Sequence, residues 1–328
     1  MTNAIATIVR PPYDSRVTSG TAQPQRVRRR HRAEALQCLA GGRRRDLQAA
    51  LRADALGEML TRSGMAGQLW QVCREGECVA AALVIPSAGR VGVVYHSPAE
   101  APGVDAAALS SALSAAANAA LKGGAAFVQA LIGPKEPRDA KALLGAGFVR
   151  LAGLSYLQRD LAESIPPGAV EGVAGATFVP CRPFDPAEMG PVILGTYAGS
   201  LDCPPLAHFR QIEDVLASHK ASGNWRPDLW WIVRVGGAPA GCVLVNESAT
   251  CPGDADLVYM GLLPHYRGRG LGRAMVRYAC GQVRREGRER MHVVVDTSNP
   301  YAVRIYEAEG FRATHERVAY IRREVFRQ

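Results

Sequence analysis

The chain has 328 residues, a formal net charge of +9 and a hydrophobic fraction of 48%. No apolar segment is long enough to span a bilayer, and residues 1–24 lack the apolar core of a secretory signal. The eight cysteines form no C-x-x-C pair and no Cys/His cluster with zinc-site spacing. These features argue against a membrane, secreted or metal-binding protein, and they predict a cytoplasmic protein with reduced thiols.

The basic charge permits two interpretations. Arginines cluster in three places, at Arg28–Arg30 with Arg32, at Arg43–Arg45, and at Arg284, Arg285, Arg288 and Arg290. They could attract nucleic acid, or they could be solvated helix faces, some of which attract the phosphates of a cofactor. No aromatic-rich RNA motif or recognition-helix pattern accompanies them, which argues against nucleic acid as a partner.

The first half of the chain, residues 25–160, is expected to form one domain after a disordered leader at 1–24. The expected elements are helices up to about Gly64, a hairpin of Leu69–Arg74 and Val79–Ile85, a strand at Val91–Tyr95, a helix from the N-cap Asp105 to Leu121, a strand at Phe127–Ile132, a helix from Pro137 to Gly145 and closing strands from Phe148 to Leu157. Prolines and glycines mark residues 161–176 as a linker.

A second domain is expected at residues 177–328, with the same order of elements. They are a strand at Thr177–Pro180, a mainly helical region from Pro191 to Gly223, a hairpin of Leu229–Arg234 and Ala240–Val245, a strand at Leu257–Leu263, an amphipathic helix from Leu271, a strand at Met291–Val295, a helix at Pro300–Ala308 and closing strands at Phe311–Val325.

The two halves align with each other. The matched segments are Leu69–Trp70 with Leu229–Trp230 at an offset of 160 residues, and Ile132–Pro137 with Val295–Pro300 and Gly147–Phe148 with Gly310–Phe311 at an offset of 163. Agreement across several elements indicates a tandem duplication of a domain-sized unit. The sequence therefore predicts two similar α/β domains.

A glycine-rich stretch lies between the strand at 257–263 and the helix that begins at Leu271. Glycines at 268, 270 and 272 let the backbone turn tightly and approach a ligand closely. The helix directs its free N–H groups and its positive dipole end at this stretch, which favours a bound phosphate. The Gly-Lys-Ser/Thr ending of a P-loop is missing, and so is the third glycine of the dinucleotide fingerprint.

The stretch Arg267–Arg273 resembles the acyl-CoA pyrophosphate loop of the GNAT superfamily of N-acyltransferases, whose pattern is Arg/Gln-x-x-Gly-x-Gly/Ala. Residues Asn299–Phe311 are similar to the family's second signature, Asn-x-x-Ala-x-x-x-Tyr-x-x-x-Gly-Phe, at every specified position. The resemblance covers Thr177 to about Arg323, and the first half extends it in weaker form to about Gln25. It implies two tandem GNAT-like domains, each with a mostly antiparallel central sheet flanked by helices. The tandem order resembles that of mycothiol synthase-type proteins.

The resemblance implies that acetyl-CoA is the acyl donor and lies between the strands Leu257–Leu263 and Met291–Val295. Backbone groups of Leu262 and Leu263 are then expected to pair with the pantetheine arm. The pyrophosphate would be held by backbone N–H groups of Arg267, Gly268, Arg269, Gly270, Leu271, Gly272 and Arg273. The Arg267 and Arg269 side chains could add charge-assisted contacts, or either could simply face solvent. Asn299 is expected to contact the cofactor, to cap the helix at Pro300, or both.

Two residues carry the expected chemistry. The family pattern places the Tyr306 hydroxyl near the CoA sulfur, where it could protonate the departing thiolate; the alternative is a tyrosine that only packs. Asp256 stands where many family members carry a catalytic glutamate, and it could be the base, act through water, or be only a polar residue at a strand start. Strand alternation places Asp256, Val258 and Met260 on one face. Glu247 and Asp254 are weaker candidates for the base.

The first copy lacks this equipment. Pro98 aligns with Pro264, but Ala99–Asp105 contains no glycine run and no arginine, and Leu143 and Glu136 replace Tyr306 and Asn299. We expect the first domain to have a binding or scaffolding role.

The sequence thus predicts an acetyltransferase that acts on an amine of a small molecule or peptide. The alternative is a non-catalytic acyl-CoA-binding or nucleic-acid-associated scaffold. The acceptor and the oligomeric state do not follow from the sequence.

Overall fold

The computed structural model describes residues 22–42, 47–62, 68–162 and 175–324. Their strands are β1 (Gln25–Arg26), β2 (Gln68–Arg74), β3 (Glu77–Ser87), β4 (Val91–His96), β5 (Phe127–Ile132), β6 (Val149–Asp160), β7 (Ala176–Pro180), β8 (Trp230–Val235), β9 (Ala238–Glu247), β10 (Ala255–Leu262), β11 (Arg290–Asp296) and β12 (Arg312–Arg322). The α-helices are α1 (Arg32–Leu39), α2 (Leu47–Arg62), α3 (Ala106–Lys122), α4 (Pro137–Gly145), α5 (Pro186–Tyr197), α6 (Ile212–Ala221), α7 (Leu271–Arg285) and α8 (Pro300–Ala308).

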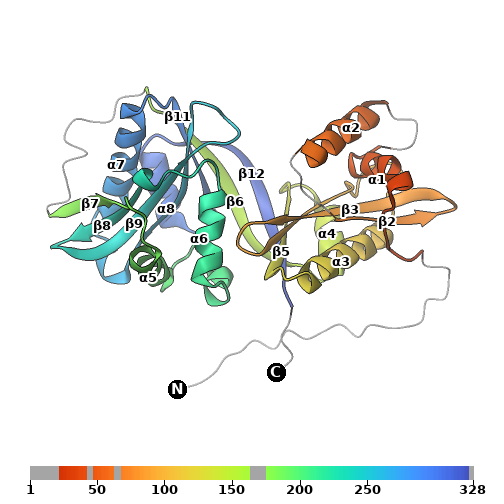
Figure 1. Cartoon of the computed structure of the whole chain (residues 1–328), viewed down its shortest axis with the longest axis horizontal. Coiled ribbons are helices and arrows are strands. Elements are labelled where there is room, and N and C mark those ends of the chain that lie inside the picture. Colours follow the sequence, from red (N-terminus) through yellow and green to blue (C-terminus); the bar gives the residue numbers. More distant parts are fainter. Residues whose placement is uncertain (1–21, 43–46, 63–67, 163–174, 325–328) are drawn as a thin grey trace, which may run out of the picture.

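All of these strands belong to one sheet, in the order β1-β2-β3-β4-β5-β12-β6-β11-β10-β9-β8-β7 (Figure 1). Neighbouring strands are antiparallel except for β4 with β5 and β10 with β11, which are parallel. The predicted α/β class with a mostly antiparallel sheet flanked by helices is confirmed. The two halves share one continuous sheet, however, where two separate sheets were expected.

The halves are joined by an exchange of their last strands. β6 ends the N-terminal half (residues 25–160) but pairs with β11 of the C-terminal half (residues 177–328), with Tyr156 opposite Val294. β12 ends the C-terminal half but pairs with β5, with Ala319 opposite Leu131. β6 and β12 also pair with each other along most of their length. Each half therefore needs the final strand of the other half to complete its sheet.

Helices cover both faces of the sheet in each half. Along β3, Ala80, Ala82 and Val84 pack in the core formed with α3, whereas Ala81, Leu83 and Ile85 pack against α1 and α2. β9 does the same, with Val243 and Val245 in the core beneath α7, and Cys242 and Leu244 in the core beneath α5 and α6. This two-sided burial explains why both strands have continuous apolar sequences without polar alternation.

Two helices begin at aspartates that cap them, and one of the two begins earlier than the sequence predicts. Asp105 caps α3 as predicted, since its carboxylate accepts a hydrogen bond from Ala108 N at 2.7 Å. The helical region expected from Pro191 begins earlier, at Pro186, because the Asp185 carboxylate accepts from Ala187 N at 2.8 Å. Pro191 then lies inside α5. None of the helices in the described ranges is long and apolar enough to cross a membrane.

Two predicted segments fall largely outside the described residues. Of the leader, residues 1–21 lie outside them, and of the linker, residues 163–174 do. The boundaries proposed at 160/161 and 176/177 therefore stay predictions, although the ends of β6 at Asp160 and the start of β7 at Ala176 are compatible with them.

We predict that a fragment of residues 175–328 does not fold alone, because it lacks β6, the strand that lies between β11 and β12. Its β11 would present an unpaired edge, and such edges promote aggregation. A fragment of residues 149–328 retains β6 and is expected to unfold cooperatively. Circular dichroism during heating, combined with size-exclusion chromatography, compares the two. A monomeric 175–328 fragment with a cooperative transition would contradict the prediction.

Candidate active site

The strands β10 and β11 separate along their length. They pair only where Ala255–Leu257 lies beside Met291–Val293. Beyond this point β10 continues to Leu262 against β9, and β11 continues to Asp296 against β6. The sheet therefore opens into a wedge between the parallel strands β10 and β11, on the side where the glycine-rich stretch begins.

A β-bulge lies at the start of this wedge. The register between β10 and β9 shifts between Leu257 and Tyr259, which leaves Val258 without a partner in the ladder. Val258 and Tyr259 both pack toward the core of α5 and α6, whereas Met260 packs toward the core of α7. Asp256, Val258 and Met260 therefore do not share one face as expected, because the bulge inserts an extra residue into the alternation.

The glycine-rich stretch forms a turn that ends at the first residue of α7. Gly268 has φ +73° and Gly270 has φ +79°, a backbone region that favours glycine, and Gly270 precedes α7 without any side-chain cap. The N–H groups of the first helical turn thus point out without a capping side chain. At Gly272 the requirement for glycine is steric, because a Cβ atom there would lie 2.8 Å from Cδ1 of Ile305 on α8.

Arg267 braces this turn. Its guanidinium donates to the carbonyl oxygens of Leu262 at 3.1 Å, Gly199 at 3.0 Å and Thr196 at 2.8 Å. This differs from the expectation of a side chain free for the pyrophosphate, because all three guanidinium nitrogens already bind backbone oxygens. The brace fixes the end of α5 onto the loop.

The other two arginines of the loop have different surroundings. The Arg269 guanidinium lies 5.7 Å from the centre of the Tyr266 ring. Arg273 donates through Nε to Glu309 at 2.8 Å, and Arg277 donates to the same carboxylate at 2.7 Å. Glu309 is buried, so this double ion pair fixes α7 against the segment that follows α8.

The backbone of the strand end is also largely engaged. Leu263 donates its N–H to Ala240 O at 2.9 Å and accepts at its carbonyl from Tyr266 N at 3.0 Å. The carbonyl of Leu262 accepts from Arg267. The Leu263 N–H is therefore engaged and its carbonyl oxygen already accepts one hydrogen bond, and the pairing of Leu262 and Leu263 with a pantetheine arm stays a prediction.

The second signature places its two polar residues at opposite ends of α8. Asn299 caps the helix, with its Oδ1 accepting from Ala302 N at 3.2 Å. Tyr306 is buried, with its ring edge-to-face with Phe311 at 5.5 Å. Its hydroxyl has no hydrogen-bond partner among the described residues, and burial raises the pKa of this hydroxyl above its usual value. Tyr306 therefore holds a proton at neutral pH that no neighbouring group in the described part of the chain accepts.

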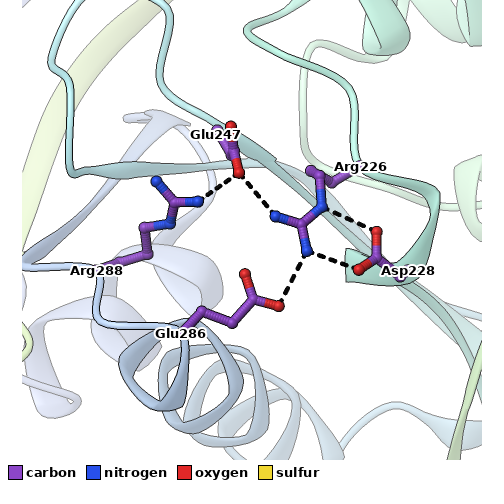
Figure 2. A network of polar contacts seen from close by, with 5 residues as sticks. All are labelled: Arg226, Asp228, Glu247, Glu286 and Arg288. Atoms are coloured by element: carbon purple, nitrogen blue, oxygen red, sulfur yellow. Dashed lines mark hydrogen bonds and ion pairs between the residues drawn. The ribbon is translucent and has the colours of Figure 1, made fainter.

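The three candidate bases differ in their partners. Glu247 accepts hydrogen bonds from Arg226 at 2.7 Å and from Arg288, within a network that also contains Asp228 and Glu286 (Figure 2). Both guanidinium groups bind the same carboxylate oxygen, Oε1, so this oxygen is already engaged by two donors.

Asp254 is likewise engaged by Arg290 and His292, whereas Asp256 interacts with the Ser248 hydroxyl. Asp254 is fully buried and accepts from Arg290 at 3.1 Å and from the His292 ring at 2.7 Å. Asp256 lies opposite His292 in the ladder, and burial raises the pKa of the Asp256 carboxyl. Of the three, Asp256 therefore has the electrostatic setting that a general base requires.

Sequence reasoning missed Asp296. This buried carboxylate ends β11 and accepts from Cys203 N at 3.0 Å, Ser298 N at 2.9 Å and Ser298 Oγ at 2.8 Å. Its contact with Cys203 ties the segment after α5 to the start of α8. The position directly before the signature Ser298-Asn299 was the available signal, since an aspartate there can fold the backbone into a turn.

Two groups of potential metal ligands occur among the described residues, Cys251 with Asp254 and His292, and Asp202 with Cys203 and Asp296. In each group the buried carboxylate already accepts hydrogen bonds at both of its oxygens. These donors compete directly with a cation for the same lone pairs.

In the N-terminal half, the corresponding anion position is occupied by its own acids. Asp105 both caps α3 and forms an ion pair with Arg74 at 2.8 Å. The Glu136 carboxylate, which aligns with Asn299, accepts from Gly133 N at 2.7 Å. A phosphate placed at the start of α3 would meet the Asp105 carboxylate instead of free N–H groups. This supports the prediction that only the C-terminal copy is equipped.

Comparison with known proteins agrees with this geometry. A model of the acetyltransferase (GNAT) family matches residues 200–311. A mycothiol acetyltransferase from Thermobispora bispora is 26% identical over 200 residues, an alignment that spans 53% of this chain and 59% of the relative. The chain thus matches less than two thirds of that relative's length.

Two solved structures share the fold. A GCN5-related N-acetyltransferase from Sphaerobacter thermophilus aligns with a TM-score of 0.55 and 19% identity, covering 89% of this chain and 90% of that chain. A glucosamine N-acetyltransferase region of a fungal multi-domain β-N-acetylglucosaminidase aligns with a TM-score of 0.54 and 15% identity, covering 94% of this chain and 39% of that chain. The family model thus matches residues 200–311 of the C-terminal half, and the fold shared with the two solved structures extends over most of the chain, so the chain is similar to GNAT acetyltransferases in both halves.

Proposed function

We propose that the C-terminal half is an N-acetyltransferase that moves an acetyl group from acetyl-CoA to an amine. The observation that carries the proposal is the convergence, in one half only, of an open wedge between β10 and β11, an uncapped helix start at Gly270 and the buried Tyr306. The similarity to a mycothiol acetyltransferase favours a small-molecule acceptor over a peptide. A cytoplasmic location, where acetyl-CoA is made and used, suits this activity.

Acetyl-CoA would enter the wedge with its pyrophosphate at the start of α7. The first-turn N–H groups from Leu271 to Arg273 would bind the phosphates, with the Arg269 side chain adding charge. The pantetheine arm would then run along β10 toward the bulge. A backbone N–H at the bulge, released from the ladder at Val258, would polarise the thioester carbonyl as negative charge develops on its oxygen.

The proton chemistry requires one acceptor and one donor. The ammonium form of the acceptor loses a proton to Asp256, directly or through water, and the amine nitrogen then attacks the thioester carbon. The tetrahedral intermediate, whose nitrogen still carries a second proton, collapses with cleavage of the C–S bond; that second proton passes to solvent, and the thiolate takes the proton of the Tyr306 hydroxyl. Solvent restores that proton after the products leave. Burial raises the pKa of both residues, which strengthens Asp256 as a proton acceptor and keeps the Tyr306 hydroxyl protonated until sulfur departs.

The nucleic-acid alternative loses support from the arginines themselves. Arg288 and Arg290 bind Glu247 and Asp254, so two members of the C-terminal arginine cluster are already paired with carboxylates of the protein. The direct test of the proposal is a panel of small amines and peptides with acetyl-CoA, read by release of free thiol. Acetyl-CoA binding without transfer to any amine would favour the non-catalytic scaffold.

For the proton donor, we predict that Tyr306→Phe lowers kcat by about a hundredfold, the usual contribution of a positioned general acid. The phenyl ring preserves the packing against Phe311, so acetyl-CoA affinity measured by calorimetry should stay within about twofold of the wild type, since only an unpaired hydroxyl is removed. Tyr301→Phe, at an exposed tyrosine of the same helix, is the matched control and should leave kcat unchanged. Equal rates for Tyr306→Phe and the wild type would remove Tyr306 from the chemistry.

For the base, the acid limb of the pH–rate profile is diagnostic. Asp256 must be ionised to accept a proton, and burial raises its pKa, so kcat/KM should fall with decreasing pH at a pH above the usual aspartate value of about 3.9. Asp256→Asn should remove this limb and lower kcat/KM by at least about a hundredfold. Glu77→Gln, at an exposed carboxylate of β3, serves as the control. Persistence of the limb in Asp256→Asn would assign it to another group.

The two loop arginines should separate stability from affinity. Arg267→Ala removes three hydrogen bonds, so the free energy of unfolding should fall by about 2–3 kcal/mol at about 1 kcal/mol each. Arg269→Ala should change it by less than about 0.5 kcal/mol but weaken acetyl-CoA binding by about tenfold through loss of one charge-assisted contact. Urea unfolding and calorimetry measure the two quantities. Unchanged affinity in Arg269→Ala would exclude its side chain from the cofactor site.

A further inference from the structure

The segment between α5 and α6 connects the candidate active site to the N-terminal half. On the site side, its first residues are tied down at two points: Arg267 binds the carbonyls of Thr196 and Gly199, and Cys203 N binds the carboxylate of Asp296. These contacts hold residues 196–203 across the open ends of β10 and β11, on the open side of the wedge.

The middle of the same segment packs on the N-terminal half. The Phe209 ring lies edge-to-face with Phe127 of β5 at 5.6 Å, and Leu206 joins Phe209 against a small buried cluster of Val91, Phe127 and Ile321. The guanidinium of Arg210 lies 5.7 Å from the centre of the Phe127 ring. An apolar contact with a cation over it therefore anchors the segment on β5.

Helix α6 continues this contact onto the turn between β3 and β4. Arg90 donates to the Asp214 carboxylate through two nitrogens, at distances of 2.7 to 3.1 Å, and Ser218 Oγ donates to Ala88 O at 3.1 Å. Figure 1 shows α6 on the side of the C-terminal half that faces β5. The carboxylate of Asp214 is largely buried, so this bidentate ion pair is less exposed to solvent than an ordinary surface ion pair.

The close approach depends on Gly89, at the centre of the turn. Gly89 has φ +72°, and a Cβ atom there would lie 2.1 Å from Asp214 O and 2.2 Å from Ser218 Oγ. Only glycine lets the turn touch the helix backbone at this distance. The turn is therefore shaped to receive α6, as well as to connect two strands.

We propose that the N-terminal half, through Gly89, Arg90 and Phe127, positions residues 198–221 as the acceptor-side wall of the C-terminal site. A copy that has lost its own phosphate site thereby contributes to acceptor selection in the other copy. The link to acceptor selection rests on the proposed function; the positioning itself does not. Arg90 is in these terms a positioning residue, since it acts on the site only through Asp214 and α6.

Hydrogen–deuterium exchange of the full chain tests the positioning without any acceptor. Gly89→Ala and Arg90→Asp should speed exchange of peptides from residues 198–221 by about fivefold or more, as expected when an ion pair and a close contact that hold a segment are lost. The charge swap Arg90→Asp/Asp214→Arg should restore slow exchange. Gly76→Ala is the matched control, because Gly76 has φ +83° in the β2–β3 turn but nothing within 4 Å of its Cβ position.

Calorimetry with acetyl-CoA and steady-state kinetics complete the test. Acetyl-CoA affinity should stay within about twofold in Arg90→Asp, whereas KM for any amine that the wild type acetylates should rise by about fivefold, in line with the loss of one partly sheltered ion pair. Unchanged exchange at 198–221 in both single variants, or equal acceleration in Gly76→Ala, would overturn the proposal. If no amine is acetylated by the wild type, the proposed function fails while the exchange comparison still decides the positioning.

Discussion

The exchange of β6 and β12 is the constraint on which the rest of the structure depends. Because β6 lies between β11 and β12, the strand that forms one wall of the wedge is itself held by the N-terminal half. Beyond Val293, β11 no longer pairs with β10, so its remaining ladder partner in this part is β6. The open side of the candidate site is thus created by β10 diverging from a strand that the opposite half fixes.

The same constraint explains how a degenerate copy can persist without a site of its own. Leu143 replaces the tyrosine of the second signature and is fully buried, and Asp105 occupies the helix start where a phosphate would bind. These substitutions fill the first copy with packing and internal capping, which suits a structural partner. Its outward contributions are the strand β6 on one side of the C-terminal half and the docking turn at Gly89 on the other.

Local chemistry in the sequence was sufficient for the order of elements, the Asp105 cap, the duplication and the two family signatures. The strand exchange was not accessible, because β6 and β12 have similar patterns and nothing local in either strand specifies its neighbour. The bulge at Val258 was equally hidden, since an inserted residue in an apolar strand leaves the hydrophobic pattern intact. The role of Arg267 depended on the carbonyls of Thr196 and Gly199, about 70 residues away, which only the folded chain brings near.

The distribution of charge then gives the site its chemical character. Glu247, Asp254 and Glu309 each accept hydrogen bonds from at least one arginine, and Asp296 accepts them from backbone and hydroxyl donors. Oxygens of these four carboxylates are therefore already engaged by donors of the protein itself. Burial raises the pKa of the Asp256 carboxyl, which has no arginine partner among the described residues. Likewise, no group among the described residues accepts the proton of the buried Tyr306 hydroxyl. A positively charged protein can therefore keep one carboxylate basic near its wedge, because its arginines are committed to the other acids.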